Sequence, residues 1–191
     1  MDILSLVKAI ESGNWENQIY AANWLKENVN HDRVAAINEL SNLDWNKVDA
    51  IVFNAASNDW SGNTPFGEEN STESTDFCGA LNEIIRLLNT KYPKIKLFFI
   101  TNGVRYWLSK IDEEWCDIYQ NSQGKTLKDY VDLNIQICNK WHIPYYDLYR
   151  LGGFNQFNFS TYFIDIAHPG HGYKIMADKI GGYLIGEGLS K

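Results

Sequence analysis

The chain has 191 residues, of which 45% are hydrophobic and 21% charged, a composition typical of one ordinary globular domain and not of a disordered chain. Its formal net charge is −7, so we do not expect nucleic acid as a partner, since a phosphate backbone is bound by basic side chains. The sequence shows no apolar run that could cross a membrane and no secretory signal at its start. The location stays open: cytoplasmic, or at a surface or on a virion if the chain is part of a longer protein.

The cysteines and histidines do not show the spacing of a metal site. Cys78, Cys116 and Cys138 form neither a zinc pattern nor a disulfide framework, so we expect three reduced, mostly buried thiols. His168 and His171 are close together, but one nearby carboxylate is too little for a set of metal ligands.

The first half of the chain begins with helical patterns and then changes to a strand. Apolar periodicity predicts helices at 3–10, 16–28 and 32–43. Residues 48–54 are the first convincing strand, because they form a short, β-branched, apolar run before a turn. Such an unbroken run is typical of a parallel strand that is buried on both faces.

The rest of the chain alternates helices with strands. Helical spacing predicts helices at 75–90, 126–140 and 170–185, and apolar runs predict strands at 95–101 and 143–148. Three irregular segments lie between them: a polar, acidic loop at 61–76, an excursion at 104–123 and an aromatic loop at 149–164. The order strand, helix, strand, helix, strand, helix predicts an α/β fold, with a parallel sheet and right-handed crossovers.

Asp165 and His168 are the first candidate site residues. They stand three residues apart, just before a Pro-Gly turn and the C-terminal helix. One short loop could therefore present a carboxylate that orients an imidazole, and the imidazole could take a proton from a hydroxyl nucleophile and return it to a leaving group. Asp-x-x-His is also common as a turn with a capping Asp, and taken alone that interpretation is favoured.

Residues 55–60 are the second candidate segment. They follow the first strand, at the edge of the sheet where open α/β folds bind ligands. The Asp165 loop could meet them there. Asn58 could donate a side-chain N–H to a developing oxyanion, a contribution of about 3 kcal/mol. The alternative is an Asn that caps a turn, which alone would be the better interpretation.

Together these segments resemble the SGNH (GDSL-type) hydrolases. Ala56-Ser57-Asn58-Asp59 is similar to the Gly-x-Asn-Asp element of that family, and Asp165-x-x-His168-Pro169, followed by Gly172-Tyr173, resembles its C-terminal Asp-x-x-His block. The resemblance covers roughly residues 45–185 and implies a flavodoxin-like, three-layer α/β/α sandwich with a parallel sheet. Within the family, the chain most resembles the SGNH domains of bacterial and phage tail or surface proteins.

The resemblance also implies roles for individual residues. His168 would be the general base, Asp165 its orienting partner and Asn58 an oxyanion-hole donor. The implied reaction is ester hydrolysis through an acyl-enzyme, with deacetylation of a carbohydrate as one common variant. It needs no metal and no organic cofactor, and the substrate would be a small-molecule or carbohydrate ester.

The sequence departs from the family in its N-terminal part. The family carries its nucleophilic Ser in a Gly-Asp-Ser turn after the first strand and an oxyanion-hole Gly after the second, and neither is found here. Ser5, Ser12 and Ser41 precede the first strand, but none follows a strand. Ala56 replaces the first Gly of Gly-x-Asn-Asp, and its methyl could crowd the backbone if this position needs a positive φ.

Three explanations stay open for this departure. The single SGNH-like domain expected over residues 1–191 could be the C-terminal portion of a longer hydrolase that lacks the first two strands. It could be a non-catalytic member, or an unidentified Ser could serve. If the first strands are absent, the edge of strand 48–54 would be bare. We would then expect the N-terminal helices, a second copy of the chain or a separate polypeptide to cover it.

Two functions from different classes therefore remain. One is an SGNH-type esterase. The other is a catalytically incomplete module that binds carbohydrate or serves in assembly, for instance in a bacterial or phage surface or tail protein. Trp60, Trp107 and Trp115 near loops would suit sugar stacking, although aromatic residues are more often part of a core or an interface. Asp165 and His168 favour the enzyme, and the missing Gly-Asp-Ser favours the module.

Overall fold

The computed structural model describes residues 43–189 of the chain. The chain divides into two compact units, Met1–Lys47 and Val48–Lys191, and the first is described only by a short 3-10 helix, η2 (Trp45–Lys47). Three predicted helices lie outside the described residues, apart from residue 43 at the end of the third: 3–10, 16–28 and 32–43. The prediction of one domain over 1–191 stays a prediction.

The second unit is built on a parallel sheet. Its three strands are β1 (Ala50–Phe53), β2 (Lys96–Ile100) and β3 (Tyr145–Tyr146), and they lie in the order β1-β2-β3. Both pairings are parallel, with Val52 opposite Phe98 and Phe99 opposite Tyr145. The predicted α/β class with a parallel sheet is confirmed, and each strand is shorter than the apolar run that predicted it.

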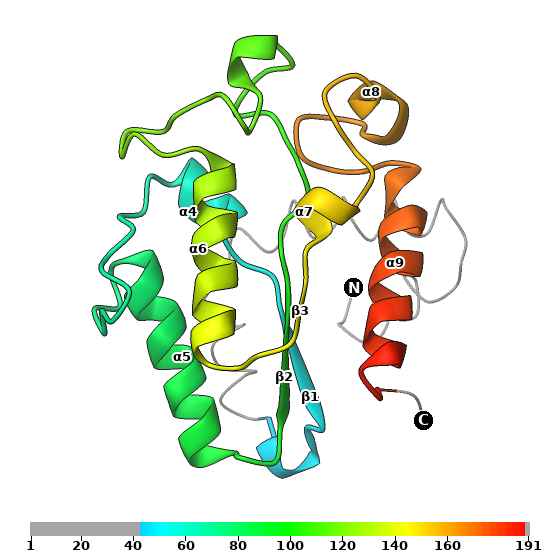
Figure 1. The fold of residues 1–191 in the computed structure, drawn as a ribbon. Helices are drawn as coiled ribbons and strands as arrows, with labels where there is room; N and C mark the ends of the chain where they lie inside the picture. Colours follow the sequence, from blue (N-terminus) through cyan, green and yellow to red (C-terminus); the bar gives the residue numbers. More distant parts are fainter. Residues whose placement is uncertain (1–42, 190–191) are drawn as a thin grey trace. The chain divides into compact units, whose positions relative to one another are not determined.

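Three long helices cover the sheet. Helix α5 (Phe77–Lys91) connects β1 to β2, helix α6 (Leu127–Lys140) connects β2 to β3, and helix α9 (Gly172–Gly186) ends the described chain. Figure 1 shows α5 and α6 on one side of the strands and α9 on the other, so the described elements of this unit form helix, sheet and helix layers. All three helices were predicted from apolar periodicity, and their observed ends differ from the predicted ones by one or two residues.

Short helices occupy places where the sequence predicted turns and loops. Residues 57–59, expected as a turn, open the short helix α4 (Ser57–Ser61). The aromatic loop at 149–164 contains most of α7 (Leu148–Leu151) and all of α8 (Phe159–Tyr162), and the excursion at 104–123 contains the 3-10 helix η3 (Asp112–Glu114). Helices this short have too few residues for an apolar period to show in the sequence.

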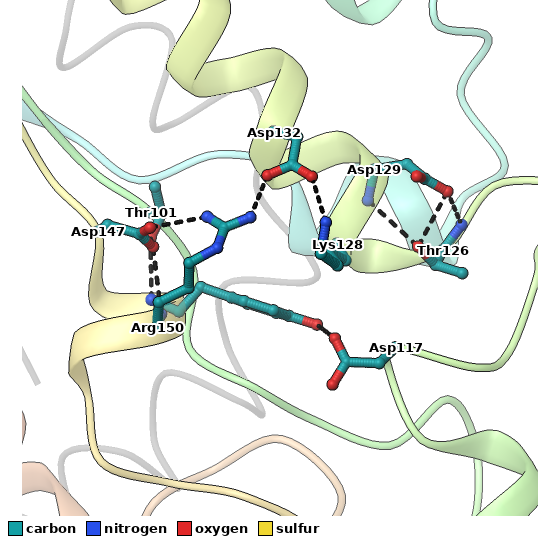
Figure 2. Close-up of polar contacts among 9 residues, drawn as sticks. Thr101, Asp117, Thr126, Lys128, Asp129, Asp132, Asp147 and Arg150 are labelled. Atoms are coloured by element: carbon teal, nitrogen blue, oxygen red, sulfur yellow. Dashed lines mark hydrogen bonds and ion pairs between the residues drawn. The ribbon is translucent and has the colours of Figure 1, made fainter.

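Side-chain caps fix where the crossover helices begin. Thr126 Oγ1 accepts a hydrogen bond from the Asp129 backbone N–H (3.2 Å), and Asp129 Oδ2 accepts one from the Thr126 N–H (2.8 Å), as Figure 2 shows. This reciprocal pair satisfies backbone donors at the start of α6. Asp76 Oδ1 accepts from the Gly79 N–H (2.6 Å) at the start of α5 in the same way.

The two neighbouring strands β1 and β2 differ in burial. Residues 97–100 of β2 are buried, whereas Val52 of β1 is 45% exposed. The prediction that the first strand is buried on both faces is therefore wrong. Among the described strands, β1 pairs with β2 alone, so it lies at an edge, and an apolar run by itself does not report how many neighbours a strand has. That another segment covers this edge stays a prediction.

The cysteines are free and buried, as predicted. Burial raises the pKa of Cys78 to about 11 and those of Cys116 and Cys138 to about 12, so all three are thiols at neutral pH. Trp60, Trp107 and Trp115 are buried as well. These tryptophans therefore contribute to the core, and none offers an exposed face on which a sugar could stack.

None of the helices in the described part of the chain is long and apolar enough to span a membrane.

Candidate active site

Asp165 and His168 form a pair within one loop, between α8 and α9. Asp165 Oδ2 lies 2.7 Å from His168 Nδ1, and Asp165 Oδ1 accepts hydrogen bonds from the backbone N–H groups of Ala167 and His168, both at 2.8 Å. The Ile164 N–H donates to the His168 carbonyl (3.0 Å) and closes the loop. The spacing of three residues thus brings the carboxylate and the imidazole together, as predicted.

The surroundings of Asp165 keep its carboxylate charged. Burial raises the pKa of this carboxyl, but the N–H groups of Ala167 and His168 and the His168 imidazole outweigh burial and hold it below its usual range. The ionised carboxylate favours a proton on Nδ1 and leaves Nε2 as the proton acceptor. The His168 side chain is 55% exposed, and no hydrogen bond joins its Nε2 to a residue within 43–189.

The loop is anchored to the segment that follows β2. The Tyr106 N–H donates to the Ile166 carbonyl (2.9 Å). The Tyr106 ring contacts Phe159 edge-on, with the ring centroids 5.0 Å apart, and Phe159 stacks on Phe163 at 4.0 Å. Because Phe163 lies two residues before Asp165, this buried aromatic cluster sets the position of the catalytic candidates relative to the sheet.

The step from β1 into α4 requires unusual backbone geometry at Ala56. This buried residue has φ 110° and ψ −38°, a region that favours glycine. Its N–H donates to Asp59 Oδ2 (3.3 Å), which holds the tight start of α4. The position where the resembled family has Gly therefore does have a positive φ here, and the methyl of Ala56 is accommodated at a cost in strain.

Ser57 and Asn58 are neighbours in the sequence, but Ser57 contacts other residues of the site and Asn58 is exposed to solvent. Ser57 donates its backbone N–H to Asn102 Oδ1 (2.9 Å), and its Oγ accepts a hydrogen bond from Arg105 Nη1 (2.9 Å). Asn58 is exposed, its carbonyl caps the end of α4 through the Gly62 N–H (2.7 Å), and its side chain makes no hydrogen bond with the part of the chain that the structure describes. Its role as an oxyanion donor stays a prediction.

A cavity of about 400 Å³ lies where these segments meet. Its polar lining comes from the ends of β1 and β2, and the Asp165 loop and α9 add mostly apolar groups. The lining includes Asn54, Ser57, Asn102, Gly103, Val104, Arg105, Ala167, Pro169, Tyr173 and Met176. Asp165, His168 and Asn58 are not lining residues, but Ala167 and Pro169 flank His168. The carboxyl ends of the strands and the Asp165 loop thus border one cavity, as the topology predicts.

Sequence reasoning missed the polar residues that line this cavity. Asn102 Nδ2 donates to Asn54 Oδ1 (2.6 Å), and Asn54 Nδ2 donates to the Ile100 carbonyl (3.1 Å), so the two asparagines tie the ends of β1 and β2 together. Arg105 joins them through Ser57. The available signal was their position, since each follows the carboxyl end of a predicted parallel strand.

The structure does not identify the nucleophile. Among the described residues, no serine hydroxyl hydrogen-bonds to His168. Three serines that precede the first strand lie outside the described residues: Ser5, Ser12 and Ser41.

Comparison with known proteins shows the fold. No family model and no curated protein matches the sequence. A solved structure from Lactobacillus plantarum superposes with a TM-score of 0.67 at 22% identity, covering 78% of this chain and 71% of that one. A possible lipase from Chitinophaga pinensis gives 0.57 at 20% identity over 74% of each chain. A candidate acylhydrolase from Bacteroides fragilis gives 0.50 at 21% identity, covering 73% of this chain and 62% of that one. The chain therefore shares its α/β fold with these structures.

Proposed function

We propose that the protein is an SGNH-type esterase in which His168 is the general base and Asp165 its orienting partner. One observation carries the proposal. A charged carboxylate holds Nδ1 of an exposed imidazole, beside a cavity at the carboxyl ends of parallel strands. This arrangement suits proton transfer to and from a hydroxyl nucleophile. The likeness of the fold to a possible lipase and a candidate acylhydrolase supports it.

The residues divide the proposed reaction into proton transfers at one atom. A serine Oγ attacks the ester carbonyl carbon while its proton moves to His168 Nε2, and Asp165 stabilises the imidazolium that results. The C–O bond to the alcohol then breaks as Nε2 returns the proton to the leaving oxygen. In the second half of the reaction, water attacks the carbonyl carbon of the acyl-enzyme while its proton moves to Nε2. The bond from that carbon to the serine Oγ then breaks as Nε2 returns the proton to Oγ, which releases the acid. Asn58 is proposed as an oxyanion donor, and the substrate as a small-molecule or carbohydrate ester, with acetyl esters as one option.

A fluorophosphonate probe tests this function, because it reacts with a serine that a neighbouring base activates. The full chain is incubated with the probe, and mass spectrometry maps any adduct. We expect one labelled serine, and we expect the His168→Ala variant to lose the label. His142→Asn is the matched control, since His142 is an exposed histidine that precedes β3, at the opposite end of the strands. Asn is chosen because His142 has φ 54°, which Asn tolerates.

The same experiment decides between the esterase and a second candidate, a catalytically incomplete module with a role in carbohydrate binding or assembly. That candidate is favoured by the absence of Gly-Asp-Ser from the sequence. Labelling of one serine that depends on His168 would support the esterase and would name its nucleophile. A folded protein that stays unlabelled would show that the Asp165–His168 pair has no serine to activate, and the module would be the better account.

A further inference from the structure

Arg105 is a cation in the cavity that pairs with no carboxylate of the described residues. Its guanidinium donates to the carbonyl of Tyr106 from Nε (3.0 Å), to the carbonyl of Trp107 from Nη2 (3.3 Å) and to Ser57 Oγ from Nη1 (2.9 Å). All three acceptors are neutral. No carboxylate among residues 43–189 lies within ion-pair distance of it, whereas Arg86 pairs with one carboxylate and Arg150 with two. A guanidinium has more N–H donors than three contacts use.

The rest of the cavity does not neutralise this charge. Among the described residues that line it, Arg105 is the one charged side chain. Burial lowers the pKa of Arg105, and the nearby Asp165 carboxylate opposes this only in part. Asp165 is already engaged with His168 and two backbone N–H groups. Beneath the guanidinium lies the buried Trp60 ring, 5.8 Å from Cζ, which adds a cation–π contact and no negative charge.

We infer that Arg105 binds an anionic group of the ligand, a carboxylate or a phosphate, and so directs the cavity toward acidic esters. The remaining N–H donors of a guanidinium suit the oxygens of such a group. Ser57 adds a hydroxyl beside them, because its Oγ accepts from Arg105 and its own O–H has no acceptor among the described residues. The ester in this statement rests on the proposed function, whereas the binding of an anion does not.

A structural role is the competing interpretation of the same contacts. The bonds from Arg105 to the Tyr106 and Trp107 carbonyls brace the segment that anchors the Asp165 loop. A brace predicts that loss of Arg105 lowers the melting temperature without changing which ligands bind. An anion site predicts a change in selectivity between charged and neutral ligands of the same shape, and the Arg105→Lys variant should retain part of it, because Lys keeps the charge.

The test measures selectivity with two matched probes, monomethyl succinate and dimethyl succinate, which differ by one charge. Calorimetric titration uses the His168→Ala protein, so that no turnover contributes heat. We expect the acidic probe to bind about 10-fold more tightly than the neutral one, because a hydrogen bond between two charged groups is stronger than one to a neutral ester oxygen. Adding Arg105→Gln should bring the two affinities to parity, and Arg105→Lys should retain part of the difference. Titration with inorganic phosphate then tells which anion the site prefers.

Several outcomes would overturn the inference: equal affinity for both probes in the parent protein, or an unchanged ratio in a folded Arg105→Gln variant. If Arg105→Gln does not fold, the parent ratio and the Arg105→Lys variant carry the test. The result is separable from the proposed function. A charge preference without fluorophosphonate labelling would keep the anion site and remove the esterase. Labelling without a charge preference would keep the esterase and remove the anion site.

Discussion

Two segments of this molecule, the start of helix α7 and the loop before α9, place an Asp three residues before a basic side chain, and the two pairs have different surroundings. Asp147 follows β3, accepts the Arg150 backbone N–H (3.2 Å) and pairs with Arg150 Nη1 (2.7 Å). Asp165 accepts the His168 backbone N–H (2.8 Å) and pairs with His168 Nδ1 (2.7 Å). The local geometry of the two pairs is similar, so the spacing alone does not distinguish a structural pair from a catalytic one.

The two pairs differ in the further partners of the basic side chain, Arg150 in one pair and His168 in the other. Arg150 also bonds Asp132, which in turn pairs with Lys128, and Asp147 accepts a hydrogen bond from Thr101 at the end of β2 (3.2 Å); Figure 2 shows this cluster. The cluster joins α7 to α6 and to the sheet. His168 has Asp165 as its partner, and its Nε2 makes no hydrogen bond with the part of the chain that the structure describes. An imidazole can also exchange a proton near neutral pH, which a guanidinium does not do.

Replacing each of the two basic side chains should separate the two pairs most clearly, because one change should affect activity and the other stability. We expect His168→Ala to lower kcat/KM for 4-nitrophenyl acetate by about 1000-fold, since general-base catalysis contributes on this scale. Its melting temperature should stay within about 2 °C of the parent value, because the side chain is largely exposed and has one described partner. Arg150→Met should show the reverse, full activity with lower stability. Equal loss of activity in both variants would mean that the Asp165–His168 pair has no catalytic role that the Asp147–Arg150 pair lacks.

Asp165→Asn should give the next largest effect. The amide can still accept from the backbone N–H groups of Ala167 and His168, so the loop should keep its shape. It cannot stabilise an imidazolium, and we expect kcat to fall by about 100-fold or more. Steady-state kinetics at neutral pH measure this, with Asp147→Asn as the matched control that should retain activity. If the two variants lose activity equally, the loss would reflect folding and not proton transfer.

Arg150→Met should lower stability by about 1 kcal/mol, which corresponds to a fall of about 3 °C in melting temperature for a chain of this size. The value is small because the Arg150 side chain is 37% exposed, and solvent screens its ion pairs. Thermal unfolding at neutral pH measures it. A larger fall would show that the cluster holds α7 in place by more than surface ion pairs.

The same cluster should make stability depend on acidity. Burial raises the pKa of Asp132, but hydrogen bonds from Lys128 and Arg150 outweigh it and hold the pKa below its usual range. A depressed pKa in the folded state means stabilisation that is complete above the unfolded value of about 4 and is lost as the pH falls through the lowered folded value. The gap in melting temperature between the parent and Arg150→Met should therefore narrow below about pH 4. A constant gap would assign the loss to packing of the Arg150 stem.

The regular elements and the Asp165–His168 pair were predictable because their signals are local. Apolar periodicity is enough to find α5, α6 and α9, and a spacing of three residues is enough to join a carboxylate and an imidazole in one loop. The cavity's polar lining was not predicted. Asn54 follows β1, whereas Asn102 and Arg105 follow β2, and these residues meet only because β1 and β2 end side by side.

Two other features depend on neighbours that a local pattern does not report. The exposure of Val52 follows from the place of β1 in the described sheet, and an apolar run reads the same at an edge as in the centre. The short helix α8 is stabilised by the rings that pack around its first residue, Phe159, because four residues are too few to form a stable helix by themselves. Tertiary contacts with residues distant in the sequence, such as Tyr106 for α8 and β2 for β1, therefore contribute to both.

Ala56 gives a predicted change in stability as small as that of Arg150→Met, and it tests whether the site stores backbone strain. A non-glycine residue at a positive φ costs about 1–3 kcal/mol, while glycine loses about 0.5–1 kcal/mol more chain entropy on folding than alanine. We therefore expect Ala56→Gly to stabilise the protein by about 1 kcal/mol in denaturant unfolding. Ala55→Gly is the matched control, because Ala55 is the preceding residue and its φ is not positive, so that variant should be destabilised. If both glycines destabilise, the fit of the Ala56 methyl outweighs its strain, and the turn into α4 has adapted to alanine.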